Sequence, residues 1–239
     1  MKNYSILAKY YDRFSHNDCD YESWSQYLLN EAKKRHVKTV ADIACGTGKM
    51  SVLLWRSGLA VTGVDCSEEM LCQAADKCRG VFVLQDMRRL QLTQPVDMAV
   101  CVNDGVNYLK PNEVQPFFCR VAENIKQGAP FVFDVSSPYK LQNALGNNVF
   151  FVDDDDATLL WTNAFRSGKA TLSLTLFERQ SNGSYLRFDE KHIQYAHSVE
   201  FLTQCLKEAG FVVAEITSDY GEKLSAESLR ITFLTRKEV

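Results

Sequence analysis

The sequence has little of what marks several large classes of protein. No apolar run approaches the length of a membrane span, and residues 1–6 lack the apolar core of a signal peptide. No dense block of lysine and arginine occurs, and the formal net charge of −3 over 239 residues gives no general attraction to phosphate groups. We therefore expect a cytoplasmic protein with no membrane partner. A nucleic-acid partner is not indicated, although net charge alone is a weak argument against one.

Patterns for metal ions and disulfides are missing too. None of the eight cysteines belongs to a C-x-x-C pair, and the four histidines are scattered along the chain. Several cysteines fall within apolar strand or helix patterns, where a thiol acts as a small apolar side chain in a reducing compartment. The run Asp153 to Asp156 is typical of a solvated loop, because adjacent carboxylates on an extended chain point in different directions. We assign no metal.

The most informative stretch runs from Lys38 to Met50. The β-rich residues 39–43 precede a turn of small residues with glycines at 46 and 48, and a helical pattern covers residues 49–56. Glycine lets a ligand approach the backbone closely, and a helix N-terminus offers free N–H groups. The pattern predicts a nucleotide-type site at the carboxyl end of a first parallel strand. The spacing differs from G-x-G-x-x-G, which disfavours a nicotinamide-dependent dehydrogenase.

Three further apolar runs end in polar residues. Residues 61–64 lead to Asp65, residues 81–84 lead to Gln85 and Asp86, and residues 96–102 lead to Asn103 and Asp104. Because helical patterns separate these runs, we expect parallel strands whose polar ends share one edge of a sheet. An acid about twenty residues past the glycine turn is placed to accept hydrogen bonds from ribose hydroxyls.

The segments ADIACGTG, VTGVDCSEEM, QDMRRL and FVFDVSSPYKL carry a family resemblance. Over residues 38–136 the chain resembles class I S-adenosylmethionine-dependent methyltransferases, and within them a group of small bacterial methyltransferases of unassigned substrate. The resemblance implies an α/β fold, with a Rossmann-like seven-stranded sheet, helices on both faces and an antiparallel last strand. It also implies S-adenosyl-L-methionine as the cofactor.

The resemblance further implies a set of cofactor-binding residues. Asp65 would bind the ribose, Met70 would lie against the adenine or in the core, and Asp86 would either meet the adenine amino group or cap a helix. An aromatic side chain suits a sulfonium cation, and Tyr11 is a better candidate for this place than Trp24. The full set is Tyr11, Trp24, Asp42, Ala44, Gly46, Gly48, Asp65, Cys66, Met70, Asp86, Met87 and Asn103.

From Val149 to Tyr195 the helical period gives way to alternation. Leucines at 172, 174 and 176 alternate with polar residues, and Ser-Asn-Gly-Ser at 181–184 predicts a hairpin turn. With a preceding strand over residues 158–165, this predicts a three-stranded antiparallel insertion that caps the site. The alternative is a ribbon for dimerisation, so the protein would be a monomer or a homodimer. The expected domains are a methyltransferase core, residues 1–148 and 196–239, and a cap, residues 149–195.

We expect the protein to transfer a methyl group to a nitrogen or oxygen atom of a small molecule under the cap. In-line displacement needs a nucleophile held about 3–3.5 Å from the methyl carbon and no side-chain nucleophile, and the sequence nominates no catalytic residue. Two alternatives stay open: a methyltransferase acting on RNA or protein, and a non-catalytic S-adenosylmethionine-binding protein. Asn103 and Asp104 stand where many amino-methylating enzymes carry Asn/Asp-Pro-Pro-Tyr. The lack of both prolines disfavours DNA bases and glutamine as acceptors.

Overall fold

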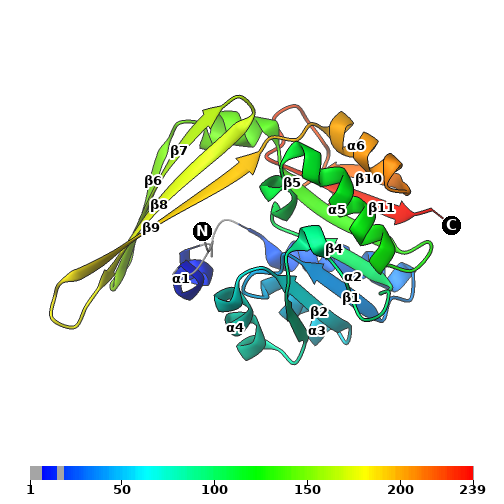
Figure 1. Ribbon diagram of the computed structural model, residues 1–239, viewed down its shortest axis with the longest axis horizontal. Helices are drawn as coiled ribbons and strands as arrows, with labels where there is room; N and C mark the ends of the chain where they lie inside the picture. The colour runs from blue at the N-terminus through cyan, green and yellow to red at the C-terminus, as the bar shows by residue number, and fades with distance from the viewer. Residues whose placement is uncertain (1–6, 15–18, 239) are drawn as a thin grey trace.

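The computed structural model describes residues 7–14 and 19–238 of the 239-residue chain. Its centre is a seven-stranded sheet in the order β10-β11-β5-β4-β1-β2-β3 (Figure 1). The five strands from β3 to β5 pair in parallel, whereas β11 is antiparallel to both β5 and β10. The predicted α/β sheet and its antiparallel last strand are confirmed. The strands are β1 Thr39–Ile43, β2 Ala60–Asp65, β3 Val81–Leu84, β4 Met98–Cys101, β5 Pro130–Ser136, β10 Phe211–Ser218 and β11 Arg230–Lys237.

Helices cover both faces of this sheet. Helices α2 (Tyr21–Lys34) and α3 (Lys49–Arg56) pack on one face, and α4 (Glu68–Lys77) lies beside α3. Helices α5 (Pro111–Asn124) and α6 (Val199–Glu208) pack on the other face. Their core is aromatic, and the rings of Phe133 and Phe233 stack across neighbouring strands with centroids 4.9 Å apart. No described helix has the length and apolar character needed to cross a membrane.

Short helical turns follow three of the strands. A 3-10 turn η1 (Met87–Arg89) comes after β3, and a second turn η2 (Gly105–Tyr108) comes after β4. A π-helical turn η3 (Lys140–Leu145) follows β5 and leads into the insertion. Because β3, β4 and β5 are parallel, all three turns stand on the carboxyl side of the sheet.

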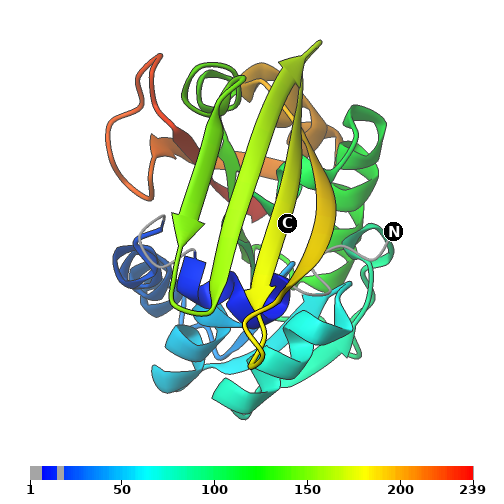
Figure 2. The same ribbon diagram turned by 90° about the vertical axis from the view of Figure 1, so that its left-hand side faces the viewer.

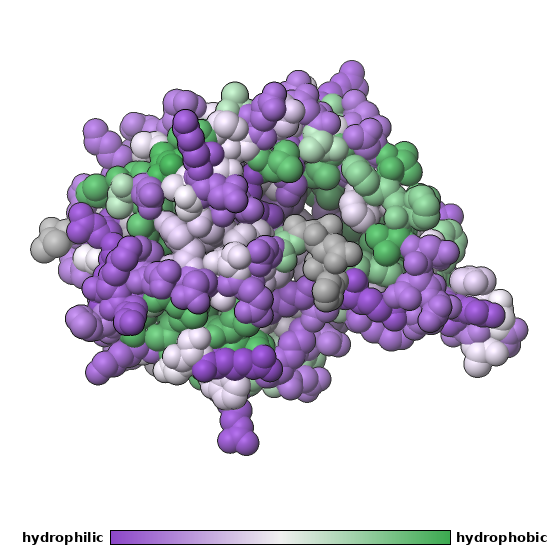
Figure 3. All heavy atoms as spheres, turned by 180° about the vertical axis from the view of Figure 1, so that it is seen from behind, coloured by the Kyte–Doolittle hydropathy of each residue, from purple (hydrophilic) through white to green (hydrophobic). Residues whose placement is uncertain are grey.

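The insertion is a separate antiparallel sheet of four strands, not the three that the sequence predicts (Figure 2). Its strands are β6 Val149–Asp153, β7 Ala157–Arg166, β8 Lys169–Arg179 and β9 Tyr185–Tyr195. The first strand is missed because residues 149–152 are all apolar and show no alternation. The predicted hairpin turn is confirmed, since Gln180 donates a backbone hydrogen bond to Ser184 between β8 and β9. In the view from behind, the tip of this sheet is hydrophilic and apolar side chains gather nearer the body (Figure 3).

Helix α1 (Leu7–Phe14) lies between the insertion and the core (Figures 1 and 2). Leu7 and Tyr10 pack against apolar residues of β7 and β8. On the core side, the Thr47 hydroxyl donates to Asp12 at 2.5 Å, and Lys77 forms an ion pair with the same carboxylate. The sequence shows no long helical pattern here. Eight residues form only a marginal helix without tertiary support. The packing on both sides supplies that support.

Gly48 gives a test of how tightly α3 and α4 approach each other. Its φ is +74°, and an added Cβ would lie 2.7 Å from the Cβ of Ala74 in α4. We expect Gly48→Ala to lower the free energy of unfolding by about 1–2 kcal/mol for backbone strain and a further ~1–3 kcal/mol for overpacking. Urea denaturation monitored by circular dichroism measures this loss.

Gly58→Ala is the matched control, because its φ is +91° and an added Cβ meets nothing within 4 Å. We expect this variant to show the backbone strain alone. Equal losses of stability in the two variants would show that Ala74 moves aside and that the helix contact does not require glycine.

Candidate active site

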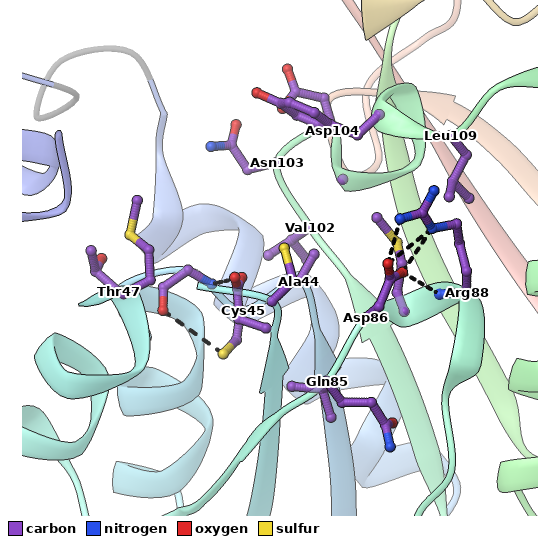
Figure 4. A pocket seen from close by; sticks show the side chains of 18 of the residues that line it. Ala44, Cys45, Thr47, Gln85, Asp86, Arg88, Val102, Asn103, Asp104 and Leu109 are labelled. Carbon is purple, nitrogen blue, oxygen red and sulfur yellow. Dashed lines mark hydrogen bonds and ion pairs between the residues drawn. The ribbon is translucent and has the colours of Figure 1, made fainter. Parts of the chain in front are cut away.

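A cavity of about 440 Å³ opens at the carboxyl edge of the parallel strands. The ends of β1, β2 and β4 form its floor, and residues of α1, η1, η2 and β9 form its walls. Nine of the twelve predicted residues line it: Tyr11, Ala44, Gly46, Asp65, Cys66, Met70, Asp86, Met87 and Asn103. Figure 4 shows the turn after β1 facing the segment with Asp86 and Arg88 across this cavity.

The turn after β1 has the backbone shape that its small residues predict. Ala44, Gly46 and Gly48 all have positive φ, at 56°, 54° and 74°. The N–H of Gly46 donates to Oδ2 of Asp65 at 2.8 Å, so the carboxylate that ends β2 holds the turn that ends β1. An added Cβ on Gly46 would meet no atom within 4 Å. This open space lets a ligand reach the backbone of the turn.

Asp65 also organises the start of the next helix. Its Oδ1 accepts the N–H of Ser67 at 2.9 Å, and Ser67 is the N-cap of α4. Burial raises the pKa of the Asp65 carboxyl, and the backbone N–H groups that it accepts oppose this rise. Met70, one turn into α4, lines the cavity and is 2% exposed.

Asp86 acts as a cap, which is one of the two roles that the sequence predicts. It accepts the N–H of Arg88 at 2.9 Å at the start of η1, and the Arg88 guanidinium pairs with its carboxylate (Figure 4). The same guanidinium contacts Glu113 at 3.0 Å. The hydrogen bond from Arg88 holds the pKa of Asp86 below its ordinary value. Asp86 is therefore an ionised group at the cavity wall.

Trp24 lies away from the cavity, which corrects its predicted place. Its ring is 2% exposed, stacks on Tyr220 with centroids 5.0 Å apart, and lies 4.4 Å from the guanidinium carbon of Arg230. Tyr21, one turn earlier in α2, lines the cavity instead. Helical spacing identified the aromatic cluster but not which ring faces the sheet edge, because both rings stand near the same face of the helix.

Asp42 and Gly48 also lie outside the cavity lining. Asp42 is fully buried behind the turn, where its Oδ2 accepts the Ser51 hydroxyl at 2.6 Å. Within the described part of the chain, no hydrogen-bond donor reaches its Oδ1. Burial raises the pKa of Asp42 to about 7, although the Ser51 hydroxyl works against this rise. Gly48 is the N-cap of α3 and stands at the end of the turn after β1.

Several cavity residues escape the sequence prediction: Tyr21, Thr47, Lys49, Arg88, Asp104, Tyr108, Lys191 and Ile193. Tyr195, which the sequence offers together with Trp161 and Phe188 as a cap surface for the acceptor, lines the cavity, whereas Trp161 and Phe188 do not. Asp104 had a signal, because it follows Asn103 at the end of a predicted strand. Lys191 and Ile193 of β9 had none, since alternation shows which side chains share a face but not what that face contacts. Among residues 7–14 and 19–238, no three histidine, cysteine or acidic side chains are grouped to hold a metal ion.

Comparison with known proteins places this geometry in a family. A model of a methyltransferase domain matches residues 40–128. A protein of Geobacillus sp. (strain WCH70), provisionally named a methyltransferase, is 32% identical over 246 residues, which cover 98% of this chain and 99% of that protein.

Solved structures agree. An S-adenosylmethionine-dependent methyltransferase from Clostridium acetobutylicum ATCC 824 has a TM-score of 0.89 at 29% identity, with 99% of each chain covered. The sugar N-methyltransferase KedS8 from Streptoalloteichus sp ATCC 53650 has a TM-score of 0.80 at 19% identity, covering 96% of this chain and 93% of that chain, and shares the fold. The chain belongs to the class I S-adenosylmethionine-dependent methyltransferases. It is an enzyme of that class with S-adenosyl-L-methionine as its cofactor, so the non-catalytic alternative falls away.

Asp65 gives the direct test of the cofactor site. A hydrogen bond to a charged group contributes about 1.5–3 kcal/mol, so we expect Asp65→Ala to weaken binding of S-adenosylhomocysteine about 10- to 100-fold. Isothermal titration calorimetry measures this. Asp76→Ala removes an exposed carboxylate from the neighbouring helix α4 and should leave the affinity unchanged. A similar loss in both variants would indicate general destabilisation.

Asp42 should make the stability of the protein depend on pH. Its pKa is about 7 in the folded protein and about 3.9 in an unfolded chain, so the folded state holds the proton more tightly. The stabilisation from this proton is complete below about pH 4 and is lost as the pH rises through about 7. Asp42→Asn has no such proton to lose. We therefore expect the stability of the variant relative to the parent to grow between pH 5 and pH 8, by on the order of 1–4 kcal/mol.

Urea denaturation of both proteins at intervals of half a pH unit measures this difference. A difference that stays constant over the range would show that Asp42 remains ionised in the folded protein despite its burial.

Proposed function

We propose that the enzyme methylates a nitrogen or oxygen atom of a small molecule held between the core and the inserted sheet. The observation that carries this proposal is the shared lining of the cavity. Lys191, Ile193 and Tyr195 of β9 line the same cavity as Gly46 and Asp65 of the core. Residues 149–195 thus serve as a cap on a core made of residues 1–148 and 196–239.

The size and lining of the cavity support a small acceptor. Small-molecule sites are clefts of about 300–1,000 Å³, and a cavity of about 440 Å³ falls in this range. Helix α1 crosses between cap and core beside it, and Tyr11 of this helix reaches the cavity. The sugar N-methyltransferase that shares this fold acts, by its name, on a small molecule.

The cofactor residues divide into three groups in this proposal. The glycine turn and Asp65 hold the ribose and the amino-acid end. Met70, Met87 and the carboxylate of Asp86 hold the adenine. Tyr11 and Asn103 stand at the methionine half, where the Nδ2 of Asn103 donates to the Tyr11 hydroxyl at 3.2 Å. Cys66, between Asp65 and the N-cap of α4, contributes backbone and thiol to the wall.

The chemistry places modest demands on the protein. When bound, S-adenosylmethionine supplies a methyl group on a sulfonium that is already activated as a leaving group. The side chains of the cavity then have to hold the acceptor in line with the carbon–sulfur bond and exclude water. The apolar Ile193 and the ring of Tyr195 suit the second task, because they bring apolar surface from the cap to the cavity. Lys191 supplies a positive group on the same strand.

The size of the methyl acceptor tests the proposal. Cell extract separated by ultrafiltration is incubated with the enzyme and cofactor labelled in the methyl group. We expect the label to appear in compounds of low molecular mass. Label that appears only in protein or RNA would overturn the small-molecule proposal and leave the methyltransferase assignment intact.

Ile193→Asp tests the contribution of the cap to this reaction. A charge at this wall should lower methyl transfer to the small-molecule fraction at least about tenfold, because burying an unpaired carboxylate opposes acceptor binding. Affinity for S-adenosylhomocysteine should change by less than about twofold, since the core residues that bind it are untouched.

Thr162→Asp is the control on the same sheet, because Thr162 is exposed and outside the cavity. Thermal melting confirms that both variants are folded. Full transfer activity in the Ile193 variant would show that the cap does not contact the acceptor.

A further inference from the structure

The turn after β4 has an unusual backbone. Asn103 and Asp104 are consecutive non-glycine residues with positive φ, at 60° and 58°. Side chains disfavour this conformation, so it persists only where the surroundings fix it. Both residues line the cavity at the carboxyl edge of the sheet (Figure 4). Strained backbone at the edge of the cavity indicates that this turn has a functional role.

Asp134 fixes the turn from behind. This carboxylate of β5 is fully buried and accepts the backbone N–H groups of Asn103 and Asp104, both at 2.7 Å. Arg230 of β11 forms a buried ion pair with Asp134 and also donates to Oδ1 of Asn103 at 3.1 Å. The Tyr220 hydroxyl donates to Asp134 as well. The turn is thus held at two N–H groups and one side chain.

The same surroundings orient the side chain of Asp104. The hydroxyl of Ser136, which is fully buried, donates to Oδ2 of Asp104 at 2.7 Å. Oδ1, the other carboxylate oxygen of Asp104, accepts no hydrogen bond from the residues that the structure describes. Asp104 is half-buried and lines the cavity, so this oxygen is available to a bound molecule.

The charge at this corner of the cavity is negative. Asp104, Asp134 and Asp219 are linked by hydrogen bonds and ion pairs around a single guanidinium, that of Arg230. Arg230 forms its ion pair with Asp134, and its charge also acts on Asp104 without a hydrogen bond between the two side chains. A carboxylate oxygen that accepts no hydrogen bond within the protein attracts a positively charged or hydrogen-bond-donating group. A methylated amine keeps a positive charge that this carboxylate stabilises, whereas a methylated hydroxyl becomes a neutral ether once its proton is lost.

We infer that Asp104 is a catalytic residue that binds the nucleophilic nitrogen of a primary or secondary amine. This inference rests on the proposed small-molecule function. The amine loses a proton to water and donates one remaining N–H to Oδ1, which turns its lone pair toward the methyl group. The nitrogen–carbon bond forms as the carbon–sulfur bond breaks, and the electron pair of the broken bond stays on sulfur. Positive charge passes from sulfur to nitrogen beside Asp104, and the methylated amine leaves as an ammonium ion.

The chemical class of the acceptor is tested with the native enzyme. The low-molecular-mass fraction of cell extract is treated with the N-hydroxysulfosuccinimide ester of acetic acid, which acylates amines. It is then incubated with enzyme and methyl-labelled cofactor. We expect the incorporated label to fall at least about tenfold relative to untreated extract, because an acylated nitrogen is not nucleophilic. Unchanged labelling of the acylated fraction would assign a hydroxyl acceptor and overturn the inference.

Asp104→Asn tests the residue. Asparagine tolerates positive φ and keeps the backbone N–H that Asp134 accepts, so the variant removes the charge and retains the turn. We expect methyl transfer to fall about 100- to 1,000-fold, as for the loss of one group that stabilises a developing charge. Affinity for S-adenosylhomocysteine should stay within about twofold of the parent. Asp76→Asn, on the exposed side of α4, is the matched control for both measurements.

A binding measurement separates recognition from turnover. The enzyme saturated with S-adenosylhomocysteine is mixed with the untreated extract fraction and ultrafiltered. The compounds that stay with the enzyme are identified by mass spectrometry. The parent should retain an amine that the Asp104→Asn variant releases. Transfer by a folded variant within about threefold of the parent would remove Asp104 from the reaction, whereas label found only in macromolecules would refute the small-molecule proposal itself.

Discussion

Two carboxylates, the fully buried Asp134 and the half-buried Asp65, hold the cavity in shape, and each acts across a pair of neighbouring strands. Asp65 ends β2 and accepts the N–H of Gly46 in the turn after β1. Asp134 lies in β5 and accepts two N–H groups of the turn after β4. In both cases a turn leaves N–H groups that no strand can pair, and a carboxylate from the next strand accepts them. The parallel sheet makes this possible, because its strand ends share one edge.

The environments of the two carboxylates differ in how their charge is balanced. Asp134 pairs with Arg230 inside the protein, and loss of either partner would leave an unpaired buried charge, which costs about 3–5 kcal/mol. Asp65 has backbone N–H groups as partners, and burial raises its pKa. Because Arg230 belongs to β11, this strand also supports the turn after β4, which lines the cavity. The antiparallel strand pair therefore supports the site as well as closing the sheet.

The sequence predicted the strand ends well, because apolar runs that stop at polar residues mark the edge of a parallel sheet. Asp65, Asp86 and Asn103 reach the cavity for this reason. Trp24 shows the limit of periodicity, which groups residues on a helix face without saying what that face contacts. Asp134 and Arg230 form an ion pair although they lie 96 positions apart in the sequence. No local sequence pattern predicts such a contact. Helix α1 and strand β6 depend on packing in the same way.

The inserted sheet and the core are joined through α1. One side of this helix packs its apolar residues on β7 and β8, and Arg13 pairs with Asp154 and Asp156 in the loop between β6 and β7. The other side places Asp12 against Thr47 in the glycine turn. Between them the Tyr11 hydroxyl accepts a hydrogen bond from Nδ2 of Asn103. The side-chain oxygen Oδ1 of Asn103 accepts in turn from Arg230. A displacement of the inserted sheet would thus pull on α1 and disturb both turns that border the cavity.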